Sequence, residues 1–171
     1  YWKSIEFSLF HKVTVSYYPS YVEEEAIHAV DETIPVKAIT AYVYEEFLQN
    51  LNKDFAKREG LLFVGGFAHP PNADAVLWFA KEVFPKIREQ IKVNFYIVGS
   101  KVTDEIKALE QPGNGIIVKG FVSEEELADL YRNCRIVVVP LRYGAGVKGK
   151  VVEAIYNGAP IVTTSVGSEG I

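Results

Sequence analysis

The sequence predicts an α/β domain in which a doubly wound, Rossmann-like parallel sheet is covered by helices. From residue 61 onward, short apolar segments alternate with longer segments of helical pattern. The apolar segments do not alternate with polar residues, which is typical of strands buried on both faces. Hydrophobic residues make up 49% of the 171-residue chain, enough for a packed core. We therefore expect a ligand site at the carboxyl ends of the strands, near a topological switch point.

The elements of this domain follow from their end signals as well as from their pattern. Ser123 precedes Glu126 by three residues, which predicts a capping box at one helix start. Asn72, after two prolines, and Thr103 are the expected caps of the two preceding helices. The expected elements are strands at 61–65, 93–98, 116–119, 135–140 and 160–164 and helices at 72–90, 103–110, 123–133 and 150–157.

The first 60 residues have a different pattern. Residues 13–18 and 35–40 predict strands on either side of a helix from Ser20 to Val30, whose glutamates suit the positive end of the helix dipole. Residues 41–60 carry apolar side chains at helical spacing among charges, which predicts a linker helix. We divide the chain into 1–40, a β-α-β piece too small to fold alone, 41–60, the linker helix, and 61–171, the main domain.

Composition argues against several classes of function. The formal charge of −4 does not suit a nucleic-acid-binding surface, and no apolar run approaches the roughly 20 residues that span a bilayer. The single Cys134 cannot form an internal disulfide and is expected to be a buried thiol. The histidines are scattered, so we expect no metal site. The chain contains no Met and begins at Tyr1, from which we expect a fragment of a longer protein.

Two glycine-containing loops follow predicted strands and are weak site candidates. Gly65 and Gly66 permit close backbone approach ahead of a helix, but the loop fits neither the dinucleotide fingerprint nor the P-loop. Alone, such a pair is often just a turn. The segment from Gly99 to Lys101 is similar and weaker.

The stretch from Gly144 to Glu153 is the stronger candidate. It combines glycines with Lys148 and Lys150 and then starts a helix, whose first N–H groups attract anions. Glu153 lies one turn into that helix among apolar neighbours and needs hydrogen-bond partners there, which ligand hydroxyls would supply. The alternative is that the lysines and Glu153 are ordinary surface residues. We favour a phosphorylated ligand, a nucleotide in particular.

Several segments of the chain follow one another in a specific order and spacing. They are Gly65-Gly66-Phe67 with His69-Pro70-Pro71-Asn72, Val118-Lys119-Gly120-Phe121-Val122, Leu130-Tyr131, Val139 to Ala154, and Gly158 to Thr164 followed by Gly167 and Glu169-Gly170. Together these segments resemble the donor half of a group 1 (family 4-like) glycosyltransferase, a retaining enzyme of the GT-B fold. The resemblance covers roughly residues 61 to 171, and residues 1–40 resemble the end of the acceptor-side domain.

The resemblance assigns roles at a site for a nucleotide-diphosphate sugar, with no metal and no cofactor. Glu153 would bind the ribose hydroxyls, and Lys150 would meet the diphosphate with the N–H groups around Gly65 and Gly66. Lys119, Phe121 and Val122 would line the base pocket. Gly144, Ala145 and Gly146 would lie near the donor sugar, and Val147 and Lys148 complete the expected donor-binding set.

This sequence departs from the family pattern in two places. The frequent two-acid pattern Glu-x7-Glu has Ala145 at its first position, so recognition of sugar hydroxyls by that acid is absent. The frequent Arg and Lys after the first glycine-containing strand are replaced by the turn from His69 to Asn72. Lys150, with Lys148 or Arg142 as candidates for assistance, is left as the main charge for phosphate.

The expected function is sugar transfer from a nucleotide-sugar to a glycan or lipid-linked acceptor, in surface polysaccharide synthesis. The resemblance implies a cytoplasmic enzyme, with peripheral membrane association at the inner face through its missing domain. By itself the chain is expected to bind the donor weakly and to transfer nothing. Two alternatives are a nucleotide-sugar 2-epimerase of the same fold and a non-catalytic Rossmann-like binding module.

Overall fold

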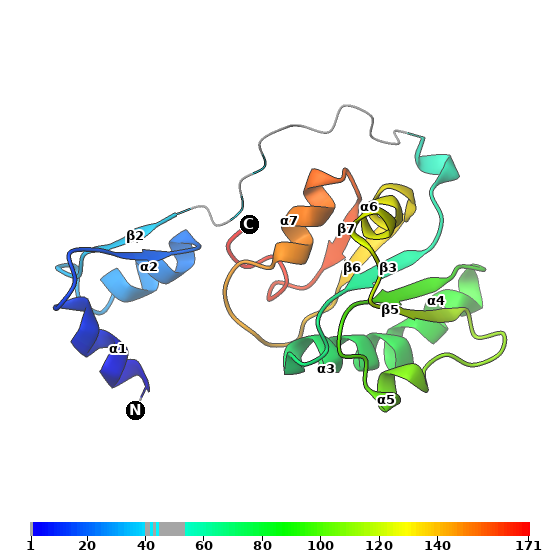
Figure 1. The fold of residues 1–171 in the computed structure, drawn as a ribbon, viewed down its shortest axis with the longest axis horizontal. Helices are drawn as coiled ribbons and strands as arrows, with labels where there is room; N and C mark the ends of the chain where they lie inside the picture. The colour runs from blue at the N-terminus through cyan, green and yellow to red at the C-terminus, as the bar shows by residue number, and fades with distance from the viewer. Residues whose placement is uncertain (1, 40–41, 43, 45–53) are drawn as a thin grey trace.

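The computed structural model describes residues 2–39, 42, 44 and 54–171, which contain two separate β-sheets (Figure 1). Most of the predicted linker helix over 41–60 falls outside the described residues. Its described end holds a 3-10 helix, Phe55–Lys57, capped by Asp54, which accepts a hydrogen bond from the N–H of Ala56. The division of the chain into three parts stays a prediction. In the described residues, no helix is both long and apolar enough to cross a membrane.

The first sheet pairs two short parallel strands, β1 (Ser16–Tyr18) and β2 (Val36–Ala38), joined by α2 (Tyr21–His28). All three elements lie within the predicted ranges. The structure adds α1 (Trp2–Phe10), which the sequence analysis missed because no cap or turn signal marks its start. A small core holds this unit together, formed by Phe10, Ile27, Ile34 and Val36.

The second sheet confirms the predicted fold class, because its strands are all parallel and are covered by helices on both faces. The strand order is β5-β4-β3-β6-β7. The strand bounds are β3 (Leu61–Val64), β4 (Phe95–Val98), β5 (Ile116–Gly120), β6 (Ile136–Val139) and β7 (Ile161–Thr163).

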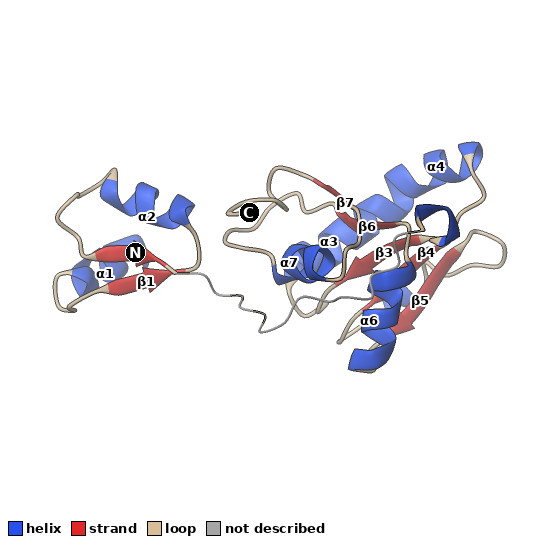
Figure 2. Ribbon diagram, turned by 90° about the horizontal axis from the view of Figure 1, so that it is seen from above, coloured by secondary structure: helices blue, strands red, loops and turns tan. Residues whose placement is uncertain are grey.

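Helices α6 (Glu124–Asn133) and α7 (Gly149–Tyr156) cover one face of this sheet. The other face is covered by α3 (Pro70–Trp78), α4 (Phe84–Gln90) and the short α5 (Asp104–Lys107) (Figure 1). Both views place the β1–β2 unit on the side of the main domain where the chain ends (Figure 2).

The predicted helix over 72–90 is interrupted by a π-helical segment, Phe79–Val83, between α3 and α4. Pro85, the second residue of α4, has no N–H to donate to the preceding turn. A local widening of the helix accommodates a residue of this kind without breaking the helix axis. Sequence pattern alone gives the helical spacing but not this change of helix type.

Two of the predicted helix caps are confirmed. The hydroxyl of Ser123 accepts from the N–H of Glu126, and that of Thr103 accepts from the N–H of Ile106. Asn72 is not a cap, since α3 begins earlier at Pro70 with His69 at its N-cap. The prolines supply the fixed backbone angle of a first helical turn, so the chain turns helical before Asn72.

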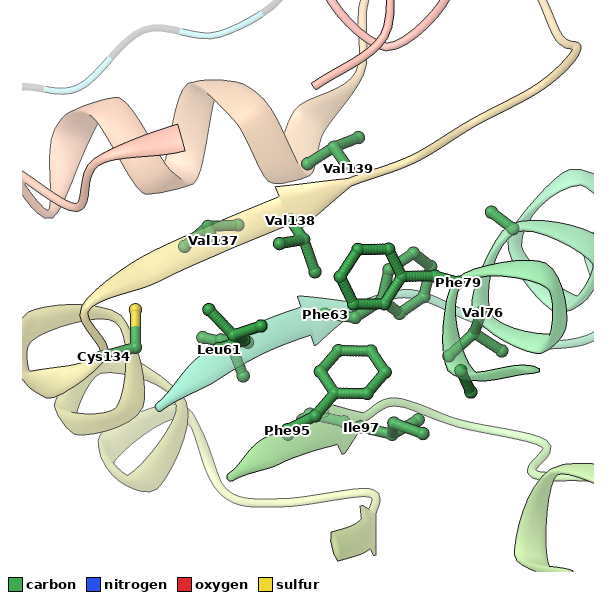
Figure 3. Close-up of a cluster of buried hydrophobic side chains, with 14 of the residues drawn as sticks. Leu61, Phe63, Val76, Phe79, Phe95, Ile97, Cys134, Val137, Val138 and Val139 are labelled. Atoms are coloured by element: carbon green, nitrogen blue, oxygen red, sulfur yellow. The ribbon is translucent and has the colours of Figure 1, made fainter. Parts of the chain in front are cut away.

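Aromatic rings and branched aliphatic side chains from β3, β4, β6 and α3 form the main core (Figure 3). Phe95 packs against Phe79 and Phe84, with ring centroids 5.0 and 5.4 Å away. Cys134 is buried in the same core, as predicted, and burial raises the pKa of its thiol to about 11. That thiol is therefore neutral and structural.

The order of the strands creates a switch point beside β3. From β3 the chain winds outward through β4 to β5, then crosses back to β6 on the other side of β3. The loops that leave β3 and β6 therefore run in opposite directions from the same edge. In doubly wound sheets, ligands bind at this place. We call the region between these two loops the crevice. These two loops are the ones that the sequence analysis selected.

Candidate functional site

The loop after β3 is fastened to the loop after β4 by close backbone contact. The N–H of Gly65 donates to the carbonyl of Val98 at 3.0 Å, and the N–H of Phe67 donates to that of Ser100 at 2.9 Å. Gly99 has φ +151°, and a Cβ there would lie 1.7 Å from the Gly65 carbonyl oxygen. The weaker candidate segment, from Gly99 to Lys101, thus has a structural part in shaping the crevice.

Asn72 joins the two sides of the crevice. Its side-chain amide donates to the carbonyl of Gly66 at 2.9 Å, and its carbonyl oxygen accepts from the ammonium of Lys150 at 2.8 Å. The residue is 7% exposed. A Cβ on Gly65 would lie 2.9 Å from Cγ of Asn72, so a glycine at that position leaves room for the amide.

Helix α7 presents its amino terminus to the same crevice. Lys148 holds the N-cap position and makes no side-chain cap hydrogen bond to any described residue. The preceding loop needs two left-handed turns, which Gly144 (φ +127°) and Gly146 (φ +77°) supply. A Cβ on Gly144 would contact Pro71 at the start of α3, at 3.8 Å. The loop before α7 therefore meets the start of α3 at the switch point.

Lys150 is the cation that the fold places in this crevice. Its ammonium lies 5.6 Å from the centroid of the Phe63 ring as well as against Asn72. Burial lowers its pKa to about 8, partly offset by the negative charge of Glu153 and reinforced by the positive charge of Lys148. The sequence-predicted Gly65, Gly66, Lys150 and Glu153 are thus brought together, with Lys150 and Glu153 three residues apart on one helix face.

Glu153 is half-buried and accepts a hydrogen bond from the hydroxyl of Tyr131, at 3.0 Å. Tyr131 belongs to α6 and is 1% exposed. Burial raises the pKa of its hydroxyl far above the ordinary value, and the Glu153 carboxylate raises it further. The sequence analysis assigned Tyr131 no role. The available signal was a tyrosine on the apolar face of α6, since a buried hydroxyl requires a partner.

Two tyrosines of the predicted linker segment lie against α7. The Tyr44 ring stacks on that of Tyr156, with centroids 3.9 Å apart. Burial and the charge of Glu153 raise the pKa of Tyr44. A Cβ on Gly149 would lie 2.8 Å from the hydroxyl oxygen of Tyr42. These contacts were not expected from the sequence.

The other two cations of the loop are occupied by carboxylates. Arg142 forms a two-pronged ion pair with Asp74, its Nε lying 2.9 Å from Oδ2, and lies over the Trp78 ring. Lys148 pairs with Glu169 at 3.1 Å and donates to the carbonyl of Gly146, with its side chain 9% exposed. Both cations are therefore engaged away from Asn72 and Lys150, and a phosphate role for Lys148 stays a prediction.

The residues predicted to lie near the donor sugar differ in their surroundings. Ala145 is exposed on the loop. Val147 lines a 200 Å³ pocket between the loop and the β1–β2 unit. A Cβ on Gly170 would lie 2.7 Å from that of Ser20, so the segment after β7 lies directly against the start of α2. Ser20 holds the predicted N-cap position there, but its hydroxyl donates to Glu23 and makes no cap bond.

The residues predicted for the base pocket lie at the end of β5, two strands from β3 in the sheet. Lys119 pairs with Glu126 at 2.7 Å, and Val122 packs against the core. Phe121 is 82% exposed. Among the described residues, no hydrogen bond, ion pair or ring contact joins these three side chains to Lys150, and their role stays a prediction. The described residues also contain no cluster of three or more His, Cys, Asp or Glu side chains suited to a metal.

Comparison with known families assigns the chain to one of them. The chain belongs to the glycosyl transferases group 1 family, whose model matches residues 58–171. A protein of Klebsiella pneumoniae, described as an uncharacterized 44.6 kDa protein in cps region, is 33% identical over 136 residues. That match covers 75% of this chain and 33% of the relative, so the chain spans about a third of its length.

Several solved structures share the fold. S. aureus TarM, in a complex with Fondaparinux, alpha-GlcNAc-glycerol and UDP, has a TM-score of 0.75 at 17% identity, over 98% of this chain and 33% of that one. The pneumococcal O-GlcNAc transferase GtfA, with UDP and GlcNAc, has a TM-score of 0.68 at 21% identity, over 93% of this chain and 31% of that one. Anabaena Alr3699/HepE, with UDP and glucose, has a TM-score of 0.65 at 18% identity, over 93% of this chain and 46% of that one.

Proposed function

We propose that this chain binds the nucleotide-diphosphate part of a sugar donor in the crevice between the loops after β3 and β6. The observation that carries the proposal is the placement of Lys150 and Glu153. Lys150 lies in the first turn of α7, against Asn72 and over Phe63, and Glu153 follows on the same helix face. A cation and free N–H groups at one point suit a diphosphate, and a carboxylate one turn away suits the ribose hydroxyls.

We further propose that the whole protein is a retaining, family 4-like glycosyltransferase. When the bond between the sugar carbon and the diphosphate oxygen breaks, negative charge collects on the diphosphate. The Lys150 ammonium and the helix dipole would stabilise that charge, so the site would need neither a metal nor a cofactor. UDP is the proposed nucleotide, because the structures of TarM, GtfA and HepE contain it.

The acceptor and the setting belong to the proposal as well. We propose a glycan or lipid-linked acceptor and a role in surface polysaccharide synthesis, at the cytoplasmic face of the membrane. The description of the K. pneumoniae relative as a protein in a cps region supports this role. We propose the same roles for the donor-binding residues as the sequence analysis did. Gly144 to Gly146 would lie near the sugar, and Lys119, Phe121 and Val122 would line the base pocket.

Calorimetry on the purified chain tests the nucleotide site. UDP, GDP, UMP and UDP-sugars are titrated into the wild type, Glu153→Ala and Lys150→Met, with Glu125→Ala as a control on the exposed first turn of α6. We expect UDP to bind the wild type and the control with the same affinity. Each site variant should lose UDP affinity by a factor of about ten or more. Lys150→Met should also erase the preference for UDP over UMP. Absence of UDP binding to the wild type, or unchanged binding by both site variants, would refute the site.

A further inference from the structure

We infer that Asn72 is a positioning residue, whose neutral amide holds the Lys150 ammonium over the crevice and leaves its charge available to a diphosphate. This inference rests on the proposed nucleotide site. It assigns a part to a side chain that the sequence analysis expected only to cap a helix.

The geometry fixes which way the amide of Asn72 points. One of its two terminal atoms lies 2.9 Å from the carbonyl oxygen of Gly66, and a carbonyl can only accept a hydrogen bond. The NH2 group must therefore face Gly66, and the oxygen must face Lys150, 2.8 Å away. At 7% exposure the amide has little room to turn. Asn72 thus presents a fixed acceptor to the ammonium.

The bond between Asn72 and Lys150 spans the crevice. Asn72 lies on α3 and Lys150 on α7, on opposite faces of the sheet, and their sequence separation is 78 residues. The long, flexible lysine side chain would otherwise sample many rotamers, at a cost in entropy on binding. Tethering it in advance lowers that cost. Asn72 therefore acts on the ligand through Lys150, without need of a contact of its own.

The neutrality of the partner distinguishes Lys150 from the other cations of the same loop. Arg142 is paired with the carboxylate of Asp74, and Lys148 with that of Glu169. Lys150 donates instead to an uncharged amide. A carboxylate at position 72 would neutralise the ammonium and repel a phosphate, whereas an amide orients the ammonium and does neither.

The pH dependence of UDP affinity reports on the surroundings of Lys150, and a purely structural role of Asn72 would not change it. Its pKa is lowered to about 8 by burial, and the charges acting on it belong to Glu153 and Lys148. The side chains that contact it from α3 and β3, Asn72 and Phe63, are uncharged. A phosphate group is fully ionised above about pH 7. The affinity for UDP should therefore fall above pH 8 because Lys150 loses its proton.

The test measures UDP affinity by calorimetry from pH 6.5 to 9.5 on the wild type, Asn72→Asp and Asn72→Leu. Asn72→Asp should bind UDP about tenfold more weakly at pH 7, and its alkaline loss of affinity should begin at higher pH, because a carboxylate raises the pKa of Lys150. Asn72→Leu should also bind UDP more weakly, but its affinity should begin to fall at a lower pH than that of the wild type. Asn157→Leu, which alters another asparagine of 7% exposure, should leave the onset unchanged.

Opposite shifts of the alkaline onset in the two Asn72 variants would support the inference. Unchanged onsets, with folding verified by circular dichroism, would overturn it, and so would wild-type affinity in Asn72→Asp. That variant keeps the shape of the side chain and gives Lys150 an ion-pair partner, which offsets the lost hydrogen bond to the Gly66 carbonyl, so it should fold even where Asn72→Leu does not. Failure of the wild type to bind UDP would instead overturn the proposed function, which keeps the two failures distinct.

Discussion

The hydroxyl of Tyr131 donates a hydrogen bond to the carboxylate of Glu153 at 3.0 Å, from the neighbouring helix. Tyr131 is 1% exposed, so its position is set by packing. Within the part of the chain that the structure describes, one oxygen of Glu153 takes this bond, and a carboxylate has further acceptor capacity for a ligand. The two helices on this face of the sheet together define the carboxylate that we assign to the ribose.

Tyr131→Phe should reduce UDP affinity about three- to tenfold, because the hydrogen bond that orients Glu153 is lost. The reduction should be smaller for 2′-deoxy-UDP, which lacks a hydroxyl for that carboxylate to bind. Calorimetry with both nucleotides measures the difference. Tyr96→Phe, which removes the hydroxyl of a half-buried tyrosine on β4, should change neither affinity. Equal losses for both nucleotides in Tyr131→Phe would mean that Tyr131 does not act through the ribose.

Gly99→Ala should destabilise the fold by about 4 kcal/mol or more, since its new Cβ would overlap the Gly65 carbonyl at 1.7 Å. Gly113→Ala is the matched control, because it also has a positive φ, +79°, but would place its Cβ in open space. It should cost only about 1–2 kcal/mol for the left-handed backbone. Urea unfolding of both variants measures the two costs. Similar values would show that the loops after β3 and β4 can separate cheaply.

The ion pair between Lys148 and Glu169 should fasten the segment after β7 to the start of α7. Glu169→Gln should lower the free energy of unfolding by about 1–3 kcal/mol, because it leaves the Lys148 ammonium, 9% exposed, without its counter-charge. Lys148→Met should cost less, since the apolar side chain needs no partner. Urea unfolding of both variants and of the double variant gives the comparison. A greater loss in Lys148→Met would contradict this account of the pair.

Lys150 should make stability depend on pH in the alkaline range. Because burial lowers its pKa from 10.5 to about 8, the folded state releases this proton before the unfolded state does. Between these pH values the unfolded chain binds more protons, so stability should rise with pH, by up to about 3 kcal/mol. Urea unfolding from pH 7.5 to 10 should show this rise in the wild type relative to Lys150→Met. Parallel curves for the two proteins would mean that Lys150 has an ordinary pKa.

Much of the main domain could be predicted, because local signals agree with one another there. The strands that contain Phe63, Phe95 and Val138 are continuous apolar runs, and the hydroxyls of Ser123 and Thr103 cap their helices as expected. The sequence analysis missed α1 because no cap marks it. It missed the π segment because Pro85 changes the helix type without ending the helical pattern.

The candidate site was predicted in outline but not in its pairings. Glycine and lysine patterns identified the loop and Lys150, since backbone approach and charge can be read locally. The partners of Lys150, Arg142 and Lys148 are set by tertiary contacts, so sequence spacing could not supply them. Asn72 shows this most clearly, because its residue type suits a cap equally well. The hydrogen bond between Tyr131 and Glu153 likewise depends on the packing of α6 beside α7, which the sequence spacing does not give.

A crystal structure of the chain with UDP tests the central claim most directly. The account predicts the diphosphate at the amino terminus of α7 within hydrogen-bond distance of the Lys150 ammonium, and a ribose hydroxyl on the carboxylate of Glu153. Asn72 should keep its bond to Gly66. UDP bound elsewhere, such as in the pocket lined by Val147 and Ile171, or with its diphosphate remote from Lys150, would contradict the account.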